Sequence, residues 1–237
     1  MAHYKKFAKV YDAIYSFKNY DREAETVHAL ISAHKKSPGN TLLDVACGTG
    51  GHIAFLRKYY AVEGVDLSDE MLAVARERHP EVVFHRGDMA KFDLGRRFDA
   101  IVCLFSAIAY MKTTRRLHAA ILNMSRHLAP GGVLIVEPFF GPDTFHAGGV
   151  DGLFVNRPEL KIARMTIPET RGGMWIIKFH MMVGTPDGLD YFTERHEGGL
   201  FSREDYLQAF SSAGLEVLHD EEGLMGRGLY IGTSAPA

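Results

Sequence analysis

Apolar residues along the chain follow two different spacings, and the change from one to the other falls near Gly39. Residues 7–15 and 24–31 carry apolar side chains at intervals of three and four, which predicts two amphipathic helices. Ser37-Pro38-Gly39 ends the second helix, because proline and glycine interrupt helical structure. We therefore expect residues 1–39 to form an N-terminal helical cap.

Beyond residue 39, short apolar runs alternate with helical patterns. One helix begins after Ser68, whose hydroxyl caps a first turn containing Asp69 and Glu70, and another is ended by Pro130-Gly131-Gly132. Strands that alternate with helices are typical of βαβ units in a parallel sheet. We expect residues 40–138 to form a doubly wound, Rossmann-like α/β core with strands at 41–46, 62–65, 82–85, 100–105 and 133–136 and helices at 51–59, from 69 onward and at 117–128.

Residues 139–200 lack this regularity, and turn-forming pairs are frequent among them. Segments 175–183 and 191–197 have the composition of antiparallel strands. The segment follows the fifth core strand at the carboxyl edge of the sheet, where open α/β folds bind ligands. We therefore predict an antiparallel β insertion that covers the substrate.

Residues 201–237 return to the core pattern. Ser202 and Asp205 fit a capping box ahead of a helix. Strands are expected at 216–219 and 229–232, and with the five earlier strands they complete a seven-stranded sheet.

The first core strand leads into a glycine-rich turn, in which Gly48 and Gly50 follow Asp44. Glycines at such a turn let the backbone approach a ligand, and the following helix presents free amide hydrogens. Asp66 ends the second strand about 20 residues later, where a carboxylate accepts the hydroxyls of a ribose. Gly87-Asp88-Met89 follows the third strand and offers a carboxylate and an amide to an adenine ring.

A dinucleotide is the first alternative for this site. Its fingerprint requires a third glycine, and Ile53 occupies that position here. The pattern therefore favours a single nucleoside without a pyrophosphate. The competing interpretation is that the three loops are ordinary turns of an α/β domain that binds no ligand.

Composition narrows the function further. The 237 residues carry a formal net charge of −2 and no long basic run, so we expect no nucleic-acid partner. No stretch of about 18 apolar residues is present, so we expect no membrane span. Cys47 and Cys103 lie in apolar runs and favour a reducing compartment. With no signal-like start, the chain is expected to be cytoplasmic, and no ligand spacing predicts a metal.

The three loops together resemble the class I S-adenosylmethionine-dependent methyltransferases. The similarity covers approximately residues 40–138 and rests on Leu42-Leu43-Asp44-Val45-Ala46-Cys47-Gly48-Thr49-Gly50, Gly64-Val65-Asp66-Leu67-Ser68, Met71-Leu72, Gly87-Asp88-Met89 and Pro130-Gly131-Gly132-Val133. The resemblance implies S-adenosyl-L-methionine as cofactor, with a binding site made by Tyr20, Ala46, Gly48, Asp66, Leu67, Met71, Asp88, Met89 and Phe105. It places Asp66 on the ribose, Asp88 on the adenine amino group and Phe105 on the sulfonium side.

Further segments resemble one branch of that family, the N,N-dimethyltransferases of dTDP-linked aminosugars of the desosamine and mycaminose type. They are Ala8-Lys9-Val10-Tyr11-Asp12, Phe98-Asp99-Ala100, residues 105–114, Val136-Glu137-Pro138-Phe139-Phe140 and Gly226-Arg227-Gly228-Leu229. The resemblance implies two methyl transfers to the amine of a dTDP-linked 3-amino deoxysugar, with antibiotic biosynthesis as the context. Similar sugar enzymes also imply a homodimer.

The same resemblance assigns the acceptor side of the site. Tyr110 would face the reacting amine, Tyr15 would lie beside the substrate, and Arg227 would meet the pyrophosphate through its planar guanidinium. Tyr11 belongs to the same apolar helical stripe as Tyr15, so that a core role and a site role compete for both. His196 is a candidate base, and Glu137 and Phe139 are candidates for contact with the acceptor.

Departures from that branch leave two alternatives open. Residues 16–20 are shorter than the corresponding first loop and lack its arginine, and Phe139 and Phe140 stand where the branch has two tryptophans. These changes favour another small amine or hydroxyl acceptor. A non-catalytic protein that binds S-adenosylmethionine is the remaining alternative.

Overall fold

A seven-stranded sheet forms the centre of the structure, a computed structural model that describes residues 2–236 and the side chains of residues 7, 8 and 10–236. Its strands lie in the order β11-β12-β5-β4-β1-β2-β3. β12 runs antiparallel to both of its neighbours, β11 and β5, and the other described pairs of this sheet are parallel. The strands are β1 (Thr41–Val45), β2 (Ala61–Asp66), β3 (Val83–Arg86), β4 (Phe98–Cys103), β5 (Leu128–Val136), β11 (Glu216–Asp220) and β12 (Leu229–Thr233). This arrangement confirms the predicted doubly wound sheet.

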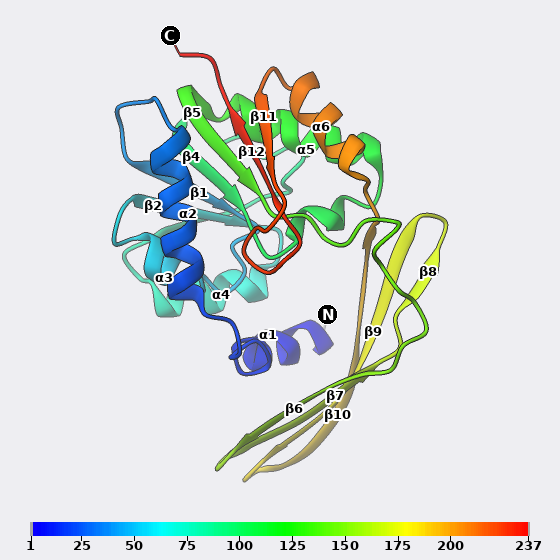
Figure 1. The fold of residues 1–237 in the computed structure, drawn as a ribbon. Coiled ribbons are helices and arrows are strands. Elements are labelled where there is room, and N and C mark those ends of the chain that lie inside the picture. The colour runs from blue at the N-terminus through cyan, green and yellow to red at the C-terminus, as the bar shows by residue number, and fades with distance from the viewer. Residues whose placement is uncertain (1, 237) are drawn as a thin grey trace.

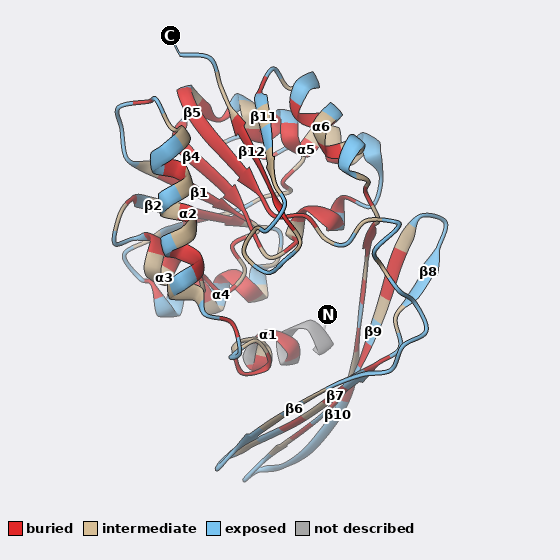
Figure 2. Ribbon diagram, in the orientation of Figure 1, coloured by how far each residue is buried: buried red, intermediate tan, exposed pale blue. Residues whose placement is uncertain are grey.

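Helices cover both faces of this sheet, which explains why its central strands are apolar at almost every position. Leu43 and Ile101 face one layer, which contains α5 (Thr114–Arg126) and α6 (Arg203–Ser212). Their neighbours Leu42 and Ala100 face the opposite layer, which contains α2 (Tyr20–His34) and α3 (Ile53–Leu56). Figure 2 shows the resulting run of buried strands between partly exposed helices, with α4 (Asp69–Arg78) beside β2 and β3.

A second sheet lies apart from the core and is reached through the segment after β5 (Figure 1). It contains β6 (Asp151–Arg157), β7 (Leu160–Thr166), β8 (Glu169–Arg171), β9 (Met174–Thr185) and β10 (Gly188–Gly199), all paired antiparallel. It confirms the predicted β insertion and is larger than the two strands that the sequence indicated. The sequence pattern did not predict β7, whose buried face carries Arg164 and Thr166 as well as Ile162. With polar residues on its buried face, the strand lacks the alternation of apolar and polar positions by which a strand is recognised.

The two N-terminal helices pack against different parts of the molecule. α1 (Ala2–Ile14) lies between the core and the second sheet, and its Phe7 and Ile14 share a cluster with Phe179 and Phe192 of that sheet. α2 instead packs on the core sheet. Among residues 2–236, no helix is both long and apolar enough to span a membrane.

Two local predictions were wrong. The helix expected at 51–59 is only the single turn of α3. Pro130-Gly131-Gly132 lies inside β5 and does not end the preceding helix, because α5 has already ended at Arg126. Gly131 has a φ of +73° and belongs to an irregular stretch of β5, where the register with β4 shifts. The predicted helix caps are confirmed: the hydroxyl of Ser68 accepts from the Met71 amide, and Ser202 and Asp205 form the capping box.

Candidate functional site

The turn after β1 combines three residues with positive φ: Ala46 at 60°, Gly48 at 56° and Gly50 at 80°. The amide of Gly48 donates to Oδ2 of Asp66 at 2.8 Å, which ties the turn to the end of β2. A Cβ atom at Gly48 would meet no atom within 4 Å, so the backbone here borders open space. The turn thus offers its backbone to a ligand at the carboxyl edge of the sheet.

Backbone amides hold both carboxylate oxygens of Asp66. The Gly48 amide donates to Oδ2 and the Ser68 amide donates to Oδ1, each at 2.8 Å. Burial raises the pKa of Asp66, and these backbone hydrogen bonds oppose that rise. Leu67, which follows it, is 61% exposed although it is a large apolar residue. Met71 is buried one helical turn further on.

Asp88 lies at the start of the loop after β3 and pairs with Arg116, whose Nη2 lies 2.9 Å from each carboxylate oxygen. Burial opposes ionisation of Asp88, but the hydrogen bonds from Arg116 and the Ala90 amide are stronger and lower its pKa. Met89 beside it is buried in the core cluster. The loops predicted to read a ribose and an adenine therefore lie next to each other along one sheet edge, at the ends of β2 and β3.

A cavity opens beside the β1 turn, and its lining includes a carboxylate that sequence reasoning did not select. Asp44 is 2% exposed, and its Oδ2 has no hydrogen-bond partner among the described residues. Burial and the nearby charge of Asp66 raise its pKa to about 8. The lining comprises Tyr11, Tyr20, Asp44, Ala46, Cys47, Gly48, Thr49, Gly51, His52, Leu104 and Phe105.

α1 is fastened over this cavity by Asp12. The hydroxyl of Thr49 donates to Oδ1 of Asp12 at 2.8 Å, and Arg78 of α4 pairs with Oδ2 at 2.6 Å. These contacts hold α1 over the β1 turn, and Tyr11 of α1 and Tyr20 of α2 both line the cavity. The ring of Tyr15 lies 5.0 Å from that of Phe105 in an edge-to-face contact.

The backbone after β4 is left-handed at two consecutive residues that are not glycine, Phe105 (φ 52°) and Ser106 (φ 60°). Such residues persist only where surrounding contacts enforce them, and they are concentrated at functional sites. The enforcing contacts are hydrogen bonds from the Phe105 amide to Oε2 of Glu137 at 2.6 Å and from the Ser106 hydroxyl to the Pro138 carbonyl at 2.7 Å.

Glu137 also binds Arg227, which comes from the loop between β11 and β12. Nη2 of Arg227 lies 2.6 Å from Oε1 of Glu137, and the two side chains are 12% and 0% exposed. Three elements that are distant in sequence thus meet at Phe105, Glu137 and Arg227. The predicted phosphate-binding arginine already has a buried carboxylate partner.

Tyr110 and His196 also meet, with the tyrosine oxygen 2.8 Å from Nδ1 of the histidine. Burial, together with the charge of Arg164, lowers the pKa of His196 to about 4. The ring of Trp175 lies 5.8 Å from Tyr110 and 4.9 Å from Phe139. The second sheet therefore contributes His196 and Trp175 to the same region as the residues after β4 and β5.

Several residues of this region carry no signal in the sequence. Lys18 is an isolated lysine in a short loop, yet its side chain is fully buried. Arg164 and Trp175 lie on strands of the second sheet whose inward face the sequence does not reveal. Asp44 is the exception, because it belongs to the recognised glycine motif. Its position just before the turn is the feature of the sequence that indicates a place in the site.

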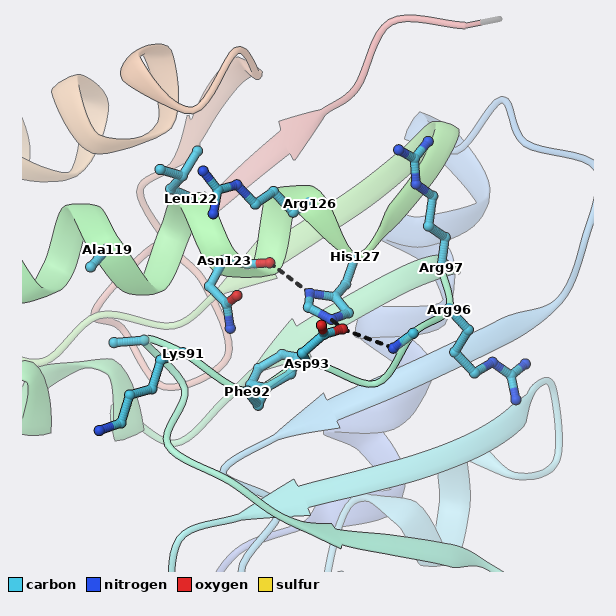
Figure 3. Close-up of a pocket in the computed structure, with 12 residues that line it drawn as sticks. Lys91, Phe92, Asp93, Arg96, Arg97, Ala119, Leu122, Asn123, Arg126 and His127 are labelled. Atoms are coloured by element: carbon cyan, nitrogen blue, oxygen red, sulfur yellow. Dashed lines mark hydrogen bonds and ion pairs between the residues drawn. The ribbon is translucent and has the colours of Figure 1, made fainter.

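A larger cavity, of about 560 Å³, lies away from this site, between the loop at residues 90–97 and α5 (Figure 3). Lys91, Arg96, Arg97 and Arg126 surround it and point in different directions. Its one buried imidazole, His127, is already engaged with the Asn123 carbonyl and the Leu94 amide. The candidate catalytic and binding residues therefore lie around the smaller cavity. The described part of the chain contains no cluster of histidine, cysteine or carboxylate side chains suited to a metal ion.

Comparison with known proteins supports this location. The family described as "Methyltransferase domain" matches residues 42–132. The chain is 39% identical over 231 residues to the dTDP-3-amino-3,4,6-trideoxy-alpha-D-glucopyranose N,N-dimethyltransferase of Streptomyces venezuelae, covering 96% of this chain and 98% of that protein. It is 40% identical over 227 residues to the dTDP-4-amino-2,3,4,6-tetradeoxy-D-glucose N,N-dimethyltransferase of Saccharopolyspora spinosa, covering 95% and 91% of the two chains.

A solved structure is similar over nearly the same length. It is the S-adenosylmethionine-bound structure of CalS10, an amino pentose methyltransferase from Micromonospora echinaspora, with a TM-score of 0.87 and 39% identity over 95% of this chain and 97% of that one. The similarity therefore includes the second sheet as well as the core.

Proposed function

The chain belongs to the family of S-adenosylmethionine-dependent sugar N-methyltransferases, and from this membership we propose that it methylates the amine of a nucleotide-linked aminosugar, with a dTDP-linked 3-amino deoxysugar as the first choice. The observation that carries the proposal is the hydrogen bond between Tyr110 and His196. It fixes a phenol oxygen at the carboxyl edge of the sheet, beside the ring of Trp175. An uncharged oxygen in that position suits a neutral amine.

The residues present fit the cofactor. Open space beside Gly48 gives room at the backbone, the carboxylate of Asp66 is fixed by two amides, and the buried Oδ2 of Asp44 has no described partner. S-adenosylmethionine supplies an electrophilic methyl group on its sulfonium when it is bound. The residues that would hold it are Tyr20, Ala46, Gly48, Asp66, Leu67, Met71, Asp88, Met89 and Phe105.

Methyl transfer to an amine is an in-line displacement, so that alignment of the nucleophile supplies much of the rate. We assign that alignment to Tyr110, whose oxygen accepts a hydrogen bond from the amine N–H and directs the nitrogen lone pair away from itself. His196 is neutral above a pH of about 4, so it acts as a positioning residue that holds the Tyr110 hydroxyl. The methylated ammonium then loses its N–H proton to water, which restores a neutral amine.

The remaining acceptor contacts are assigned to Tyr11, Tyr15, Glu137, Phe139 and Arg227. Phe139 and Trp175 form an aromatic wall suited to the apolar faces of a deoxysugar. Burial raises the pKa of Tyr15, and its ring packs edge-to-face against the Phe105 ring at 5.0 Å. Glu137 holds the backbone of Phe105 and the guanidinium of Arg227 at once.

One observation favours a second candidate, another small amine or hydroxyl acceptor without a nucleotide. Arg227 is already neutralised by the fully buried Glu137 at 2.6 Å. The first loop, residues 16–20, also lacks the arginine found in the aminosugar branch. A non-nucleotide acceptor requires neither cation.

Calorimetry on the protein saturated with S-adenosylhomocysteine separates the two candidates. A nucleotide-linked acceptor predicts that dTDP binds at least about tenfold more tightly than thymidine, which corresponds to about 1.4 kcal/mol. Equal and negligible binding of both would reject the nucleotide. A panel of amines and alcohols, assayed by release of S-adenosylhomocysteine, then identifies the alternative acceptor.

We also propose that two copies of the chain associate through the outer face of the second sheet. Phe154, Ala163, Met182 and Tyr191 are cross-strand neighbours in one row over β6, β7, β9 and β10. Phe154, Met182 and Tyr191 are each more than half exposed. Contiguous apolar surface of this kind marks interaction sites.

The reduced, buried Cys47 and Cys103 support assignment to a reducing compartment such as the cytoplasm.

A further inference from the structure

The end of β10 contacts η1 (Ala107–Met111), the short 3-10 helix after β4 that carries Tyr110. Two successive residues of the strand make polar contacts with this segment. Nδ1 of His196 lies 2.8 Å from the Tyr110 oxygen, and Oε1 of Glu197 lies 2.5 Å from Nζ of Lys112, the residue that follows η1. The segment that carries the phenol is therefore attached to the second sheet at two points.

These two contacts hold the strand from opposite faces. Successive side chains of a strand point to opposite faces of its sheet, so His196 and Glu197 lie on different sides of β10. β10 is an edge strand of the second sheet, and η1 can therefore reach both of its faces. Tyr110 contacts the inner face and Lys112 contacts the outer face. η1 cannot shift along or around the strand without losing one of the two contacts.

The backbone at the end of η1 depends on this attachment. Lys112 has a φ of 62° although it is not a glycine. Such a conformation costs free energy and persists where surrounding contacts enforce it. The amide of Lys112 donates to the Ala109 carbonyl at 3.1 Å, and its side chain pairs with Glu197. The ion pair therefore helps to hold the turn from which Tyr110 projects.

Gly198 provides the room for this contact. A Cβ atom at Gly198 would lie 2.6 Å from the Ala109 carbonyl oxygen and 2.6 Å from Cζ2 of Trp175. Both distances are shorter than an ordinary van der Waals contact, so a larger residue would force one of these neighbours away. Ala109 immediately precedes Tyr110, and the Trp175 ring packs edge-to-face against the Tyr110 ring at 5.8 Å. Displacement of either neighbour therefore moves the phenol.

The cofactor loops lie elsewhere and share none of these contacts. Asp66 is fixed by the Gly48 and Ser68 amides, and Asp88 pairs with Arg116. All of these residues belong to the core. A change at the end of β10 should therefore reach Tyr110 without disturbing the loops assigned to the cofactor.

We propose that Lys112, Glu197 and Gly198 are positioning residues, which fix the Tyr110 oxygen against the acceptor amine by holding η1 on the edge of β10. The inference rests on the proposed role of Tyr110 in aligning that amine. It follows that the core holds the cofactor while the second sheet sets the position of the acceptor nitrogen.

Adding a single Cβ atom tests the spacing. Gly198→Ala places this atom against Ala109 and Trp175, whereas Gly152→Ala, on β6 of the same sheet, meets its nearest neighbour at 3.7 Å and is the control. With the aminosugar as acceptor, we expect Gly198→Ala to lower kcat at least about tenfold, because alignment of the nucleophile supplies much of the rate. The KM for S-adenosylmethionine should change less than about twofold, and the control should match the wild type.

A second set of variants tests the ion pair. Glu197→Gln removes the charge that holds Lys112, and Arg195→Gln, which removes the other cation near Glu197 at 3.2 Å, is its control. We expect Glu197→Gln to lower kcat about threefold or more and Arg195→Gln to leave it unchanged. The exchange of both charges, Lys112→Glu with Glu197→Lys, should restore most of the lost rate. The pair is partly exposed and adds little to stability, so the melting temperature should stay close to that of the wild type.

Trp175 is the single tryptophan of the chain, and its fluorescence reports the same contact without any acceptor. We expect acrylamide to quench its emission more strongly in Gly198→Ala than in the wild type or Gly152→Ala, because a displaced indole is more exposed. Unchanged quenching would show that a Cβ atom fits at this position, and the role of Gly198 would be wrong.

The kinetic outcomes are distinguishable. If Gly198→Ala does not fold, the ion-pair variants decide. An unchanged kcat in both Gly198→Ala and Glu197→Gln overturns the inference, and so does an equal loss in Glu197→Gln and Arg195→Gln. If wild-type protein methylates no aminosugar, the proposed acceptor is wrong, and the same kcat comparison with the acceptor identified by the panel decides the inference.

Discussion

Two aspartates at the carboxyl edge of the core differ in the donors available to them. Asp66 receives hydrogen bonds from the Gly48 and Ser68 amides, whereas Oδ2 of Asp44 receives none from the described residues. A carboxylate without donors in a buried position retains its proton to higher pH. Asp44 therefore has a pKa of about 8 in the folded protein, against an ordinary value of 3.8.

This raised pKa makes stability depend on pH. Between about pH 4 and pH 8 the folded protein holds a proton on Asp44 that the unfolded chain releases, so its stability falls as the pH rises through this window and levels off above it. Without cofactor, the melting temperature of the wild type should fall between pH 5 and pH 8.5 by several degrees more than that of Asp44→Asn, since about 1 kcal/mol corresponds to about 2–4 °C at this size.

Thermal unfolding followed by circular dichroism at five pH values measures this difference. Asp143→Asn, in an exposed loop, is the control and should follow the wild type. Parallel curves for wild type and Asp44→Asn would show that Asp44 is ionised in the folded protein.

At the scale of single elements, α6 is the clearest case in which local sequence determines structure. The hydroxyl of Ser202 accepts from the Asp205 amide at 3.1 Å, and the Asp205 carboxylate accepts from the Ser202 amide at 2.8 Å. These contacts involve residues three positions apart, so no distant part of the chain is needed to form them.

Loss of this cap should destabilise the protein without affecting the site. Ser202→Ala is expected to lower the free energy of unfolding by about 0.5–2 kcal/mol, because the helix loses a hydrogen bond to one of its free amides. Chemical denaturation measures the change, with Ser212→Ala at the other end of α6 as control. A loss equal to that of the control would contradict the importance of the cap.

Other elements depend on contacts beyond their own residues. The helix predicted at 51–59 is cut to one turn, Ile53–Leu56, although its apolar spacing is favourable. Ile53 and Leu56 are buried in different clusters, on the two sides of the turn. In β7 the inward side chains include Arg164, which is stabilised by contacts beyond its own strand, among them Asp151 at 3.1 Å and the Phe179 ring at 4.6 Å.

At the scale of the whole molecule, the two faces of the second sheet differ. Its inner face packs against α1 and delivers His196 to the site. Its outer face carries the exposed row of Phe154, Ala163, Met182 and Tyr191. A sheet with one face buried in its own chain leaves the other free to bury apolar surface between copies.

A charge in that row should separate the copies. Met182→Glu places a carboxylate at the centre of the row, and desolvating it at an interface is costly. We expect wild-type protein to sediment as a dimer and Met182→Glu as a monomer in analytical ultracentrifugation. Leu218→Lys, at an exposed apolar position on β11 of the core sheet, is the control and should remain dimeric. A wild-type monomer, or a Met182→Glu dimer, would reject this interface.

The sequence by itself determined the parallel core and the cofactor loops, because both depend on short-range patterns. Apolar runs identify the buried strands, and the residues from Asp44 to Gly50, Asp66 and Asp88 lie at or just after the carboxyl ends of β1, β2 and β3. Parallel strands bring their carboxyl ends to one edge, so these loops had to meet.

The acceptor side was decided only by the tertiary structure. Tyr110 contacts His196, Phe105 contacts Glu137, and Lys18 contacts Met225 beside Arg227. In each case the partners lie far apart in the sequence. No local spacing encodes such contacts, because they arise when the second sheet, α1 and the loop after β11 pack against the same edge. Burial then determines which of these charges are paired and which remain available to a ligand.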